Sequence, residues 1–280
     1  MNFAFIIKLL YNKYLEWKME DYMATFIFTL SYLLIFVLSM VYINSNLFIL
    51  WLFTSYPLAF LTVIIFYLLN FPIVLILRPT SRYKACLMKS LASFLNTWVL
   101  NLKVDVEGLE NIPQAGPIVA YANHKSYTDA FAILQFFPRP ITLTPKKTVL
   151  KIPFLKWWLK AYDVFPINRN SPKETLKDLE KAVSTVKNNH VILVFPEGSI
   201  KDRLSLKVEH AKAGSFRLVK EAQADILPIR FLGNDLARKR WPRRSKRKII
   251  IYPPIPYQSF KDLNTKDIAK IFMDVINQES

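Results

Sequence analysis

Residues 117–129 of the chain read PIVAYANHKSYTD and join a short apolar run to a polar motif. The run from Pro117 to Ala122 is typical of a buried strand, because it is short and bounded by polar residues. The pattern Ser-x-x-Asp that closes the stretch has the spacing of a capping box, which predicts a helix starting at about Tyr127. We therefore expect His124 in a turn between a strand and a helix.

His124 and Asp129 have the chemistry of a base and the acid that orients it. Five residues apart, they would not face each other on one continuous helix, but a turn between them lets the carboxylate fold back toward the imidazole. A neutral imidazole can take a proton from a hydroxyl, and a nearby carboxylate fixes its tautomer. The spacing also fits a second interpretation, in which Asp129 only caps a helix and His124 is a buried structural ring.

The rest of the chain after the first 100 residues alternates short apolar strands with helical segments, which is typical of an α/β fold. The clearest predicted helix has Ser171 as its N-cap and Pro172 at its first position, and it ends near Asn188. We expect a mixed, largely parallel sheet flanked by helices. Its predicted strands are Pro117 to Ala122, Val191 to Phe195, Ile226 to Phe231 and Lys248 to Tyr252.

The N-terminal part of the chain predicts a membrane anchor. No charged residue and no histidine occurs from Tyr22 to Leu77, whereas one bilayer span needs about 20 apolar residues. A polar turn divides this stretch into two predicted helices, at about 24–43 and 47–69, which form a helical hairpin. Residues 1–77 are thus expected to be the anchor and residues 78–280 a single globular domain. Two prolines in the second segment leave a shallow re-entrant pair as the alternative.

The charge distribution suggests where the globular domain lies. The chain has a formal net charge of +17, and all of this excess lies after Leu77, since the acidic and basic residues before it cancel. Basic residues flank both outer ends of the hairpin, so the positive-inside rule places those ends in the cytoplasm. A basic tethered domain is attracted to anionic lipid head groups.

The single cysteine, Cys86, excludes an internal disulfide and fits a reducing compartment.

A run from Leu236 to Lys248 carries eight of the basic residues around Trp241. In a soluble protein this composition would favour nucleic acid as the partner. On a tethered domain we favour a membrane-facing loop, and we expect no nucleic acid partner.

Two further clusters could bind a substrate. Glu197, Gly198 and Ser199 follow a predicted strand, at the edge where α/β sheets place their ligands. Arg169 precedes the long helix and could bind a phosphate, or it could be a solvated surface arginine.

The chain has only five glycines and no Gly-rich phosphate loop, so the sequence has no motif for nucleotide binding. His190 and His210 lack matching partners in the sequence, and no metal site is expected.

These blocks, in this order, resemble the glycerol-phosphate and lysophosphatidic acid acyltransferase family with its H-x4-D motif. The resemblance spans about Leu102 to Pro256. It rests on four blocks: Asn123 to Asp129; Pro145 to Arg169, with the runs Lys151-Ile152-Pro153-Phe154-Leu155 and Phe165-Pro166-Ile167-Asn168-Arg169; Phe195 to Ser199; and Leu227-Pro228-Ile229.

The resemblance implies that His124 deprotonates a lysolipid hydroxyl, which attacks an acyl thioester of coenzyme A or acyl carrier protein, while Asp129 orients His124. It implies that Arg169, Glu197 and Gly198 hold the glycerol-phosphate end, with Lys147 and Ser199 near it. No metal, covalent intermediate or permanently bound cofactor is implied.

Two positions depart from the family pattern. Ile200 replaces the arginine that usually follows Pro-Glu-Gly-Thr, and Asp163 replaces a glycine. An isoleucine cannot bind phosphate as that arginine does, so Lys201 or Arg203 could substitute for it, or the acceptor's head group differs from a simple phosphate.

The expected function is acyl transfer to lysophosphatidic acid, with glycerol 3-phosphate or another lysolipid as alternative acceptors. A non-catalytic membrane adaptor, or a nucleic-acid-binding membrane protein that uses residues 238–248, is the alternative of another class. The expected location is a membrane with the domain on its cytoplasmic face, either the bacterial inner membrane or the endoplasmic reticulum.

Overall fold

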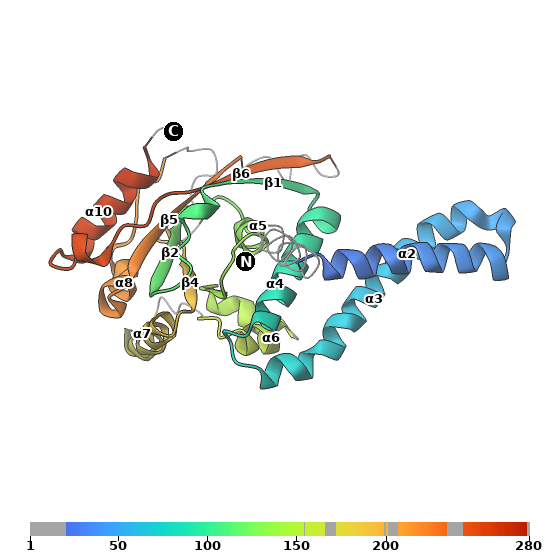
Figure 1. Ribbon diagram of the computed structural model, residues 1–280, viewed down its shortest axis with the longest axis horizontal. Coiled ribbons are helices and arrows are strands. Elements are labelled where there is room, and N and C mark those ends of the chain that lie inside the picture. Colours follow the sequence, from blue (N-terminus) through green and yellow to red (C-terminus); the bar gives the residue numbers. More distant parts are fainter. Residues whose placement is uncertain are drawn as a thin grey trace, which may run out of the picture.

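The computed structural model describes residues 21–153, 155–165, 172–198, 200, 207–233 and 243–278. Two long apolar helices, α2 (Met23–Tyr42) and α3 (Phe48–Ile76), form a hairpin that projects from the rest of the molecule (Figure 1). Both helices are long and apolar enough to cross a membrane, and most of their side chains are not buried in the protein. The predicted pair of helices is confirmed, but α3 ends seven residues later than the predicted Leu69, because the helix continues through Pro57 and Pro72.

The polar residues between the two helices close the hairpin. The Asn44 side chain accepts a hydrogen bond from the backbone N–H of Asn46 (2.9 Å), which caps the short 3-10 helix η1 (Ser45–Leu47). The Trp51 indole N–H donates to the Asn44 carbonyl (2.9 Å). These bonds satisfy backbone groups that a chain reversal would otherwise leave without partners.

Helix α4 (Arg82–Phe94) joins the hairpin to the globular domain, and the π-helix η2 (Leu95–Val99) follows it. The backbone N–H of Ala24 donates to Ser90 Oγ on α4 (2.7 Å). The rings of Phe28 on α2 and Phe94 on α4 lie 5.4 Å apart. The hairpin is thus packed against α4 as well as joined to it through the chain.

The domain is built on a six-stranded sheet in the order β1-β6-β5-β2-β4-β3. Among the described strands, only the β5 and β6 pair is antiparallel, so the predicted mixed, largely parallel sheet is confirmed. The four predicted strands are all present, although β6 begins three residues before Lys248. Two strands, β1 and β3, were not predicted. The strands are β1 (Leu102–Glu107), β2 (Ile118–Ala122), β3 (Ile141–Leu143), β4 (Val191–Val194), β5 (Asp225–Leu232) and β6 (Ser245–Ile251).

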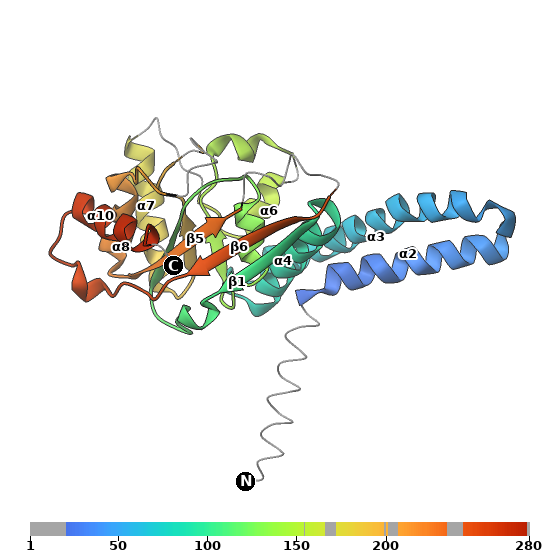
Figure 2. The same cartoon turned by 90° about the horizontal axis from the view of Figure 1, so that it is seen from above.

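Helices cover both faces of the sheet, and the central strands are buried on both sides. On one face α7 (Pro172–Lys187), α8 (Arg217–Ala222) and α10 (Thr265–Ile276) pack against one apolar cluster. On the other face, toward the hairpin, α4 and α5 (Asp129–Leu134) pack against a second one (Figures 1 and 2). Double coverage explains why the central strands are continuous apolar runs.

Candidate functional site

The site forms where β2 ends, and Asn123 fixes the chain there. Its side-chain amide donates to the carbonyl of Phe231 on β5 (3.0 Å), and its oxygen accepts from the backbone N–H of Phe231 (2.6 Å). Asn123 is buried, so these two bonds satisfy an amide that cannot reach water. The next residue, His124, therefore leaves the sheet from a rigid position.

His124 and Asp129 face each other as predicted. His124 Nδ1 lies 3.2 Å from Asp129 Oδ2, and the imidazole stacks on the Phe195 ring with centroids 4.2 Å apart. The His124 side chain is 21% exposed, whereas the Asp129 side chain is fully buried. The ring is thus held from two sides and is still reachable from solvent.

The turn between the two residues differs from the prediction. Helix α5 begins at Asp129, two residues after the predicted Tyr127. The Ser126 hydroxyl does not accept the backbone N–H of Asp129, so this half of the predicted capping box is absent. The carboxylate half is formed, because Asp129 Oδ2 accepts the backbone N–H of Ser126 and also that of Lys125, each at 2.8 Å. The interpretation of Asp129 as only a helix cap is therefore insufficient, since the same oxygen faces the imidazole.

Arg247 also contacts Asp129, and sequence reasoning missed it. Its Nη1 lies 3.2 Å from Asp129 Oδ1, and both side chains are fully buried. Burial lowers the pKa of Arg247, while the Asp129 charge opposes that shift. Within the described part of the chain, Nε and Nη2 of Arg247 have no hydrogen-bond partner. The sequence placed this arginine in a basic loop, but residues 245–251 are strand β6, and Arg247 lies on its inward face.

Glu197, predicted as a substrate-binding residue, lies beside the pair. Its Oε1 accepts the backbone N–H of His124 (2.8 Å). Burial raises the pKa of the Glu197 carboxyl, and the hydrogen bond from His124 partly offsets this effect. Glu197 thus joins the end of β4 to the end of β2.

Gly198 follows in a left-handed conformation (φ +74°), which disfavours any side chain there. A Cβ atom at Gly198 would lie 3.0 Å from Nζ of Lys212, so this ammonium group packs against the glycine. Lys212 was not predicted, because a lysine in an irregular segment carries no spacing signal. It places a positive charge next to Gly198.

The remaining predicted substrate-binding residues are not assembled by the described structure. Arg169 and Ser199 lie outside the described residues, as do Lys201 and Arg203. Lys147 begins the 3-10 helix η4 (Lys147–Lys151), and only its backbone is described. Their roles stay predictions. Asp163, which replaces a family glycine, has φ +48°, a conformation that explains a preference for glycine at this position.

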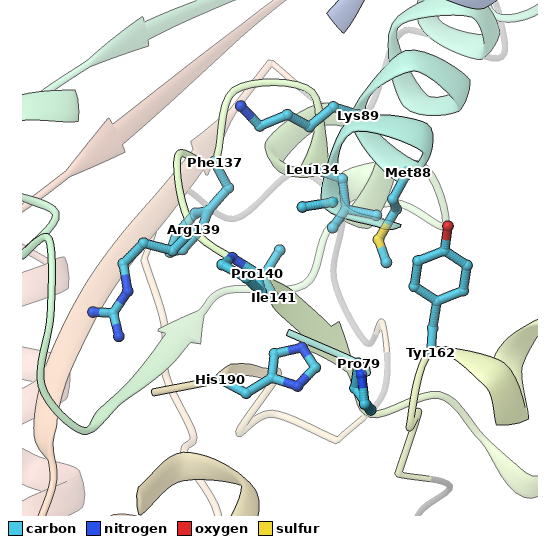
Figure 3. Close-up of a pocket in the computed structure, with 11 residues that line it drawn as sticks. Pro79, Met88, Lys89, Leu134, Phe137, Arg139, Pro140, Ile141, Tyr162 and His190 are labelled. Atoms are coloured by element: carbon cyan, nitrogen blue, oxygen red, sulfur yellow. The ribbon is translucent and has the colours of Figure 1, made fainter. Parts of the chain in front are cut away.

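A separate pocket lies between α4 and the start of β4, and none of the predicted site residues lines it (Figure 3). His190 borders this pocket and is buried. Burial, and to a smaller extent the nearby Lys84 and Arg139, lower the His190 pKa to about 4, although Asp163 and a hydrogen bond with the backbone at Ile141 oppose the shift. This histidine is neutral in the folded protein at physiological pH.

The His190 environment predicts acid sensitivity. Because the folded pKa of about 4 is below the unfolded value of 6.5, the stabilisation is complete above pH 6.5 and is lost as pH falls toward 4. From pH 7.5 to pH 5 the loss is about 2 kcal/mol. Unfolding measured at both pH values should show that His190→Gln removes this part of the pH dependence. An unchanged pH dependence in the variant would contradict the assignment.

The part of the chain that holds the site is similar to known proteins. Residues 103–232, which contain His124, Asp129, Glu197 and Gly198, match the family model described as Acyltransferase. The chain is 33% identical over 132 residues to a 1-acyl-sn-glycerol-3-phosphate acyltransferase of Saccharomyces cerevisiae, which covers 47% of this chain and 43% of the relative. It is 34% identical over 134 residues to the Pseudomonas aeruginosa protein of the same name, covering 47% of this chain and 51% of the relative.

These alignments span about half the length of the curated relatives. Among solved structures, the 1-acyl-sn-glycerophosphate acyltransferase PlsC of Thermotoga maritima superimposes with a TM-score of 0.61 at 24% identity. The superposition covers 76% of this chain and 86% of that chain, and it supports the fold. Residues 103–232, just under half of the chain, are therefore similar to the acyltransferase family.

Proposed function

We propose that this protein transfers a fatty acyl group from an acyl thioester to the free hydroxyl of lysophosphatidic acid, giving phosphatidic acid. The observation that carries the proposal is the 3.2 Å contact between His124 Nδ1 and Asp129 Oδ2 at the end of β2, inside the acyltransferase-family domain. The names of the similar proteins support the choice of acceptor.

His124 acts as the general base in this proposal. With Nδ1 directed to Asp129, Nε2 takes the proton of the acceptor hydroxyl as its oxygen attacks the thioester carbonyl carbon. The tetrahedral intermediate collapses by breaking the carbon–sulfur bond, and the imidazolium returns the proton to the leaving thiolate. The products are an ester and a free thiol, and no bond to the enzyme forms.

The neighbours of the pair hold it ready for this step. Asp129 accepts two backbone N–H groups and faces the Arg247 guanidinium, so its carboxylate is oriented before substrate binds. Glu197 anchors the His124 backbone, and Phe195 supports the ring face. A base held in this way needs little reorganisation in the transition state.

In this proposal Lys212 meets the acceptor phosphate. Its ammonium packs against Gly198, next to Glu197, and can supply the positive charge that the family arginine supplies at the position of Ile200. Arg169, Lys147 and Ser199 remain in the proposed phosphate site on the family resemblance.

The donor in this proposal is acyl-coenzyme A or acyl carrier protein, used as a substrate. The α2–α3 hairpin anchors the protein in the membrane, and the domain lies on the cytoplasmic face of a bacterial inner membrane or of the endoplasmic reticulum. The basic domain is then close both to anionic lipids and to its soluble acidic donors.

An acceptor screen tests the proposal. The purified full-length protein in lipid vesicles is given one labelled acyl donor and, in turn, lysophosphatidic acid, glycerol 3-phosphate, lysophosphatidylethanolamine or lysophosphatidylglycerol. Lysophosphatidic acid should give the highest kcat/KM. A higher value for an acceptor without a terminal phosphate monoester would reassign the acceptor but leave the acyl transfer intact.

Lys212→Ala tests how the acceptor is recognised. Losing one charge-assisted hydrogen bond to phosphate, worth about 1.5–3 kcal/mol, should raise KM for lysophosphatidic acid roughly 10- to 100-fold. The rate with saturating acceptor should change less, because Lys212 does not contact the reacting atoms in this proposal. Lys207→Ala, an exposed lysine five residues earlier, is the matched control. Equal KM values for the two variants would show that Lys212 does not bind the acceptor phosphate.

A further inference from the structure

Helix α6 (Leu155–Ala161) is fixed against the base of the anchor. The Trp158 ring lies 5.0 Å from that of Phe71 and 6.0 Å from that of Tyr67, both on α3. Lys84 Nζ on α4 donates to the carbonyl of Ala161 (2.7 Å). Figure 2 shows α6 on the side of the domain that faces the hairpin. The position of α6 relative to the anchor is therefore set by specific contacts.

These contacts define the depth of α6 along the anchor. Phe71 lies five residues before the end of α3, a distance of about 7 Å along the helix axis. The last turn of α3 beyond it is apolar, and its Ile73, Leu75 and Ile76 are exposed, Ile76 to 85%. A lipid layer that covers α3 to its end also has to reach α6.

The outward surface of this region combines exposed apolar side chains with lysines. Ile152 and Trp157 are 51% and 53% exposed, and Leu155 is also exposed. Exposed lysines alternate with them. Aromatic and aliphatic side chains flanked by lysines are typical of helices that lie in the membrane interface, where the ammonium groups reach the head groups. We call this surface the α6 ledge and define it by Lys151, Ile152, Leu155, Lys156, Trp157 and Lys160.

We propose that the α6 ledge is a second membrane contact, which inserts its apolar side chains at the lipid head-group boundary and pairs its lysines with anionic lipids. Two observations select a lipid surface as the partner: the ledge continues the apolar surface of α3, and its charges complement an anionic leaflet. A hairpin alone leaves the domain free to tilt, whereas two contacts hold one face of the domain on the membrane. This inference does not depend on the proposed catalytic activity.

Site-directed spin labelling of the full-length protein in vesicles tests the ledge. Cys86 is the single cysteine of the chain, so a Cys86→Ser background accepts one label at Trp157→Cys. The control label is Leu109→Cys, which is 38% exposed and follows β1, a strand that leads away from the anchor (Figure 2). The label at position 157 should be more accessible to oxygen than to a water-soluble nickel complex, and the label at 109 should show the reverse. Equal accessibilities at the two positions would overturn the proposal.

Two further measurements keep the test independent of local damage and of other partners. A label at Ile152→Cys should report the same lipid environment as the label at position 157. Because this second variant keeps Trp157, the result does not depend on the loss of that side chain. Adding about one quarter phosphatidylglycerol to phosphatidylcholine vesicles should increase the depth of the label at 157 in the lipid layer. Changing Lys151, Lys156 and Lys160 to Gln should abolish that increase. A label at 157 that stays water-exposed in vesicles and becomes immobile only with an acidic protein would contradict a lipid partner.

Discussion

The His124→Ala variant is expected to lose acyl transfer by at least roughly 10²- to 10⁴-fold, the contribution typical of a positioned general base. The imidazole is the ring that Asp129 orients and Phe195 supports, and alanine leaves the acceptor hydroxyl without a proton acceptor. Initial rates with saturating lysophosphatidic acid and acyl-coenzyme A measure the effect. Because the His124 side chain is partly exposed, its removal should change the melting temperature little.

His210→Ala is the matched control for this variant, since His210 is an exposed histidine of the same domain. It should keep the wild-type rate. Near-normal turnover in His124→Ala would refute base catalysis at this residue, and equal losses in both variants would point to a general sensitivity of the fold.

The Arg247→Met variant is expected to lose stability and activity together. Removing one partner of a buried ion pair leaves an uncompensated charge and costs about 3–5 kcal/mol. Here the remaining charge would be Asp129, which is fully buried. For a domain of this size, the loss corresponds to a melting temperature lower by roughly 10 °C. Thermal unfolding of the full-length protein in detergent, with rates measured below the transition, reports both effects.

Lys248→Met is the control for Arg247→Met. Lys248 is the next residue on β6, and its contact with Glu107 (2.8 Å) is exposed, so the expected loss is at most about 1 kcal/mol. A second control combines Arg247→Met with Asp129→Asn. This double variant should be more stable than Arg247→Met alone, because no buried carboxylate is left without its guanidinium, although it should stay inactive. If Arg247→Met and Lys248→Met have the same melting temperature, the buried ion pair with Arg247 does not stabilise the position of Asp129.

Much of the fold could be predicted from periodicity and length. β2, β4 and most of β5 are apolar runs buried on both faces, and the two anchor helices lie in a stretch without charges. β1 was missed because only continuous apolar runs were taken as strands, whereas Leu102–Glu107 alternates apolar with exposed charged residues and is buried on one face only. The end of α3 was misplaced because proline is a weak stop signal in an apolar segment, where no competing water solvates the backbone.

The site was predictable where its residues are close in sequence. His124 and Asp129 are five apart, and Glu197 stands directly after a predicted strand. Arg247 reaches Asp129 across 118 residues, and the pairing of β6 with both β1 and β5 brings it there. Its basic neighbours favoured a membrane-facing loop, so local composition pointed away from its buried position. Contacts that the sheet order creates leave no spacing pattern in one sequence.

The most direct test of the account uses the full-length protein and its His124→Ala variant side by side, in vesicles with labelled lysophosphatidic acid and acyl-coenzyme A or acyl carrier protein. We expect the wild type to form phosphatidic acid and free thiol in equal amounts, and the variant to form neither above background. Absence of acylated product from the wild type with both donors, or equal product from both proteins, would contradict it.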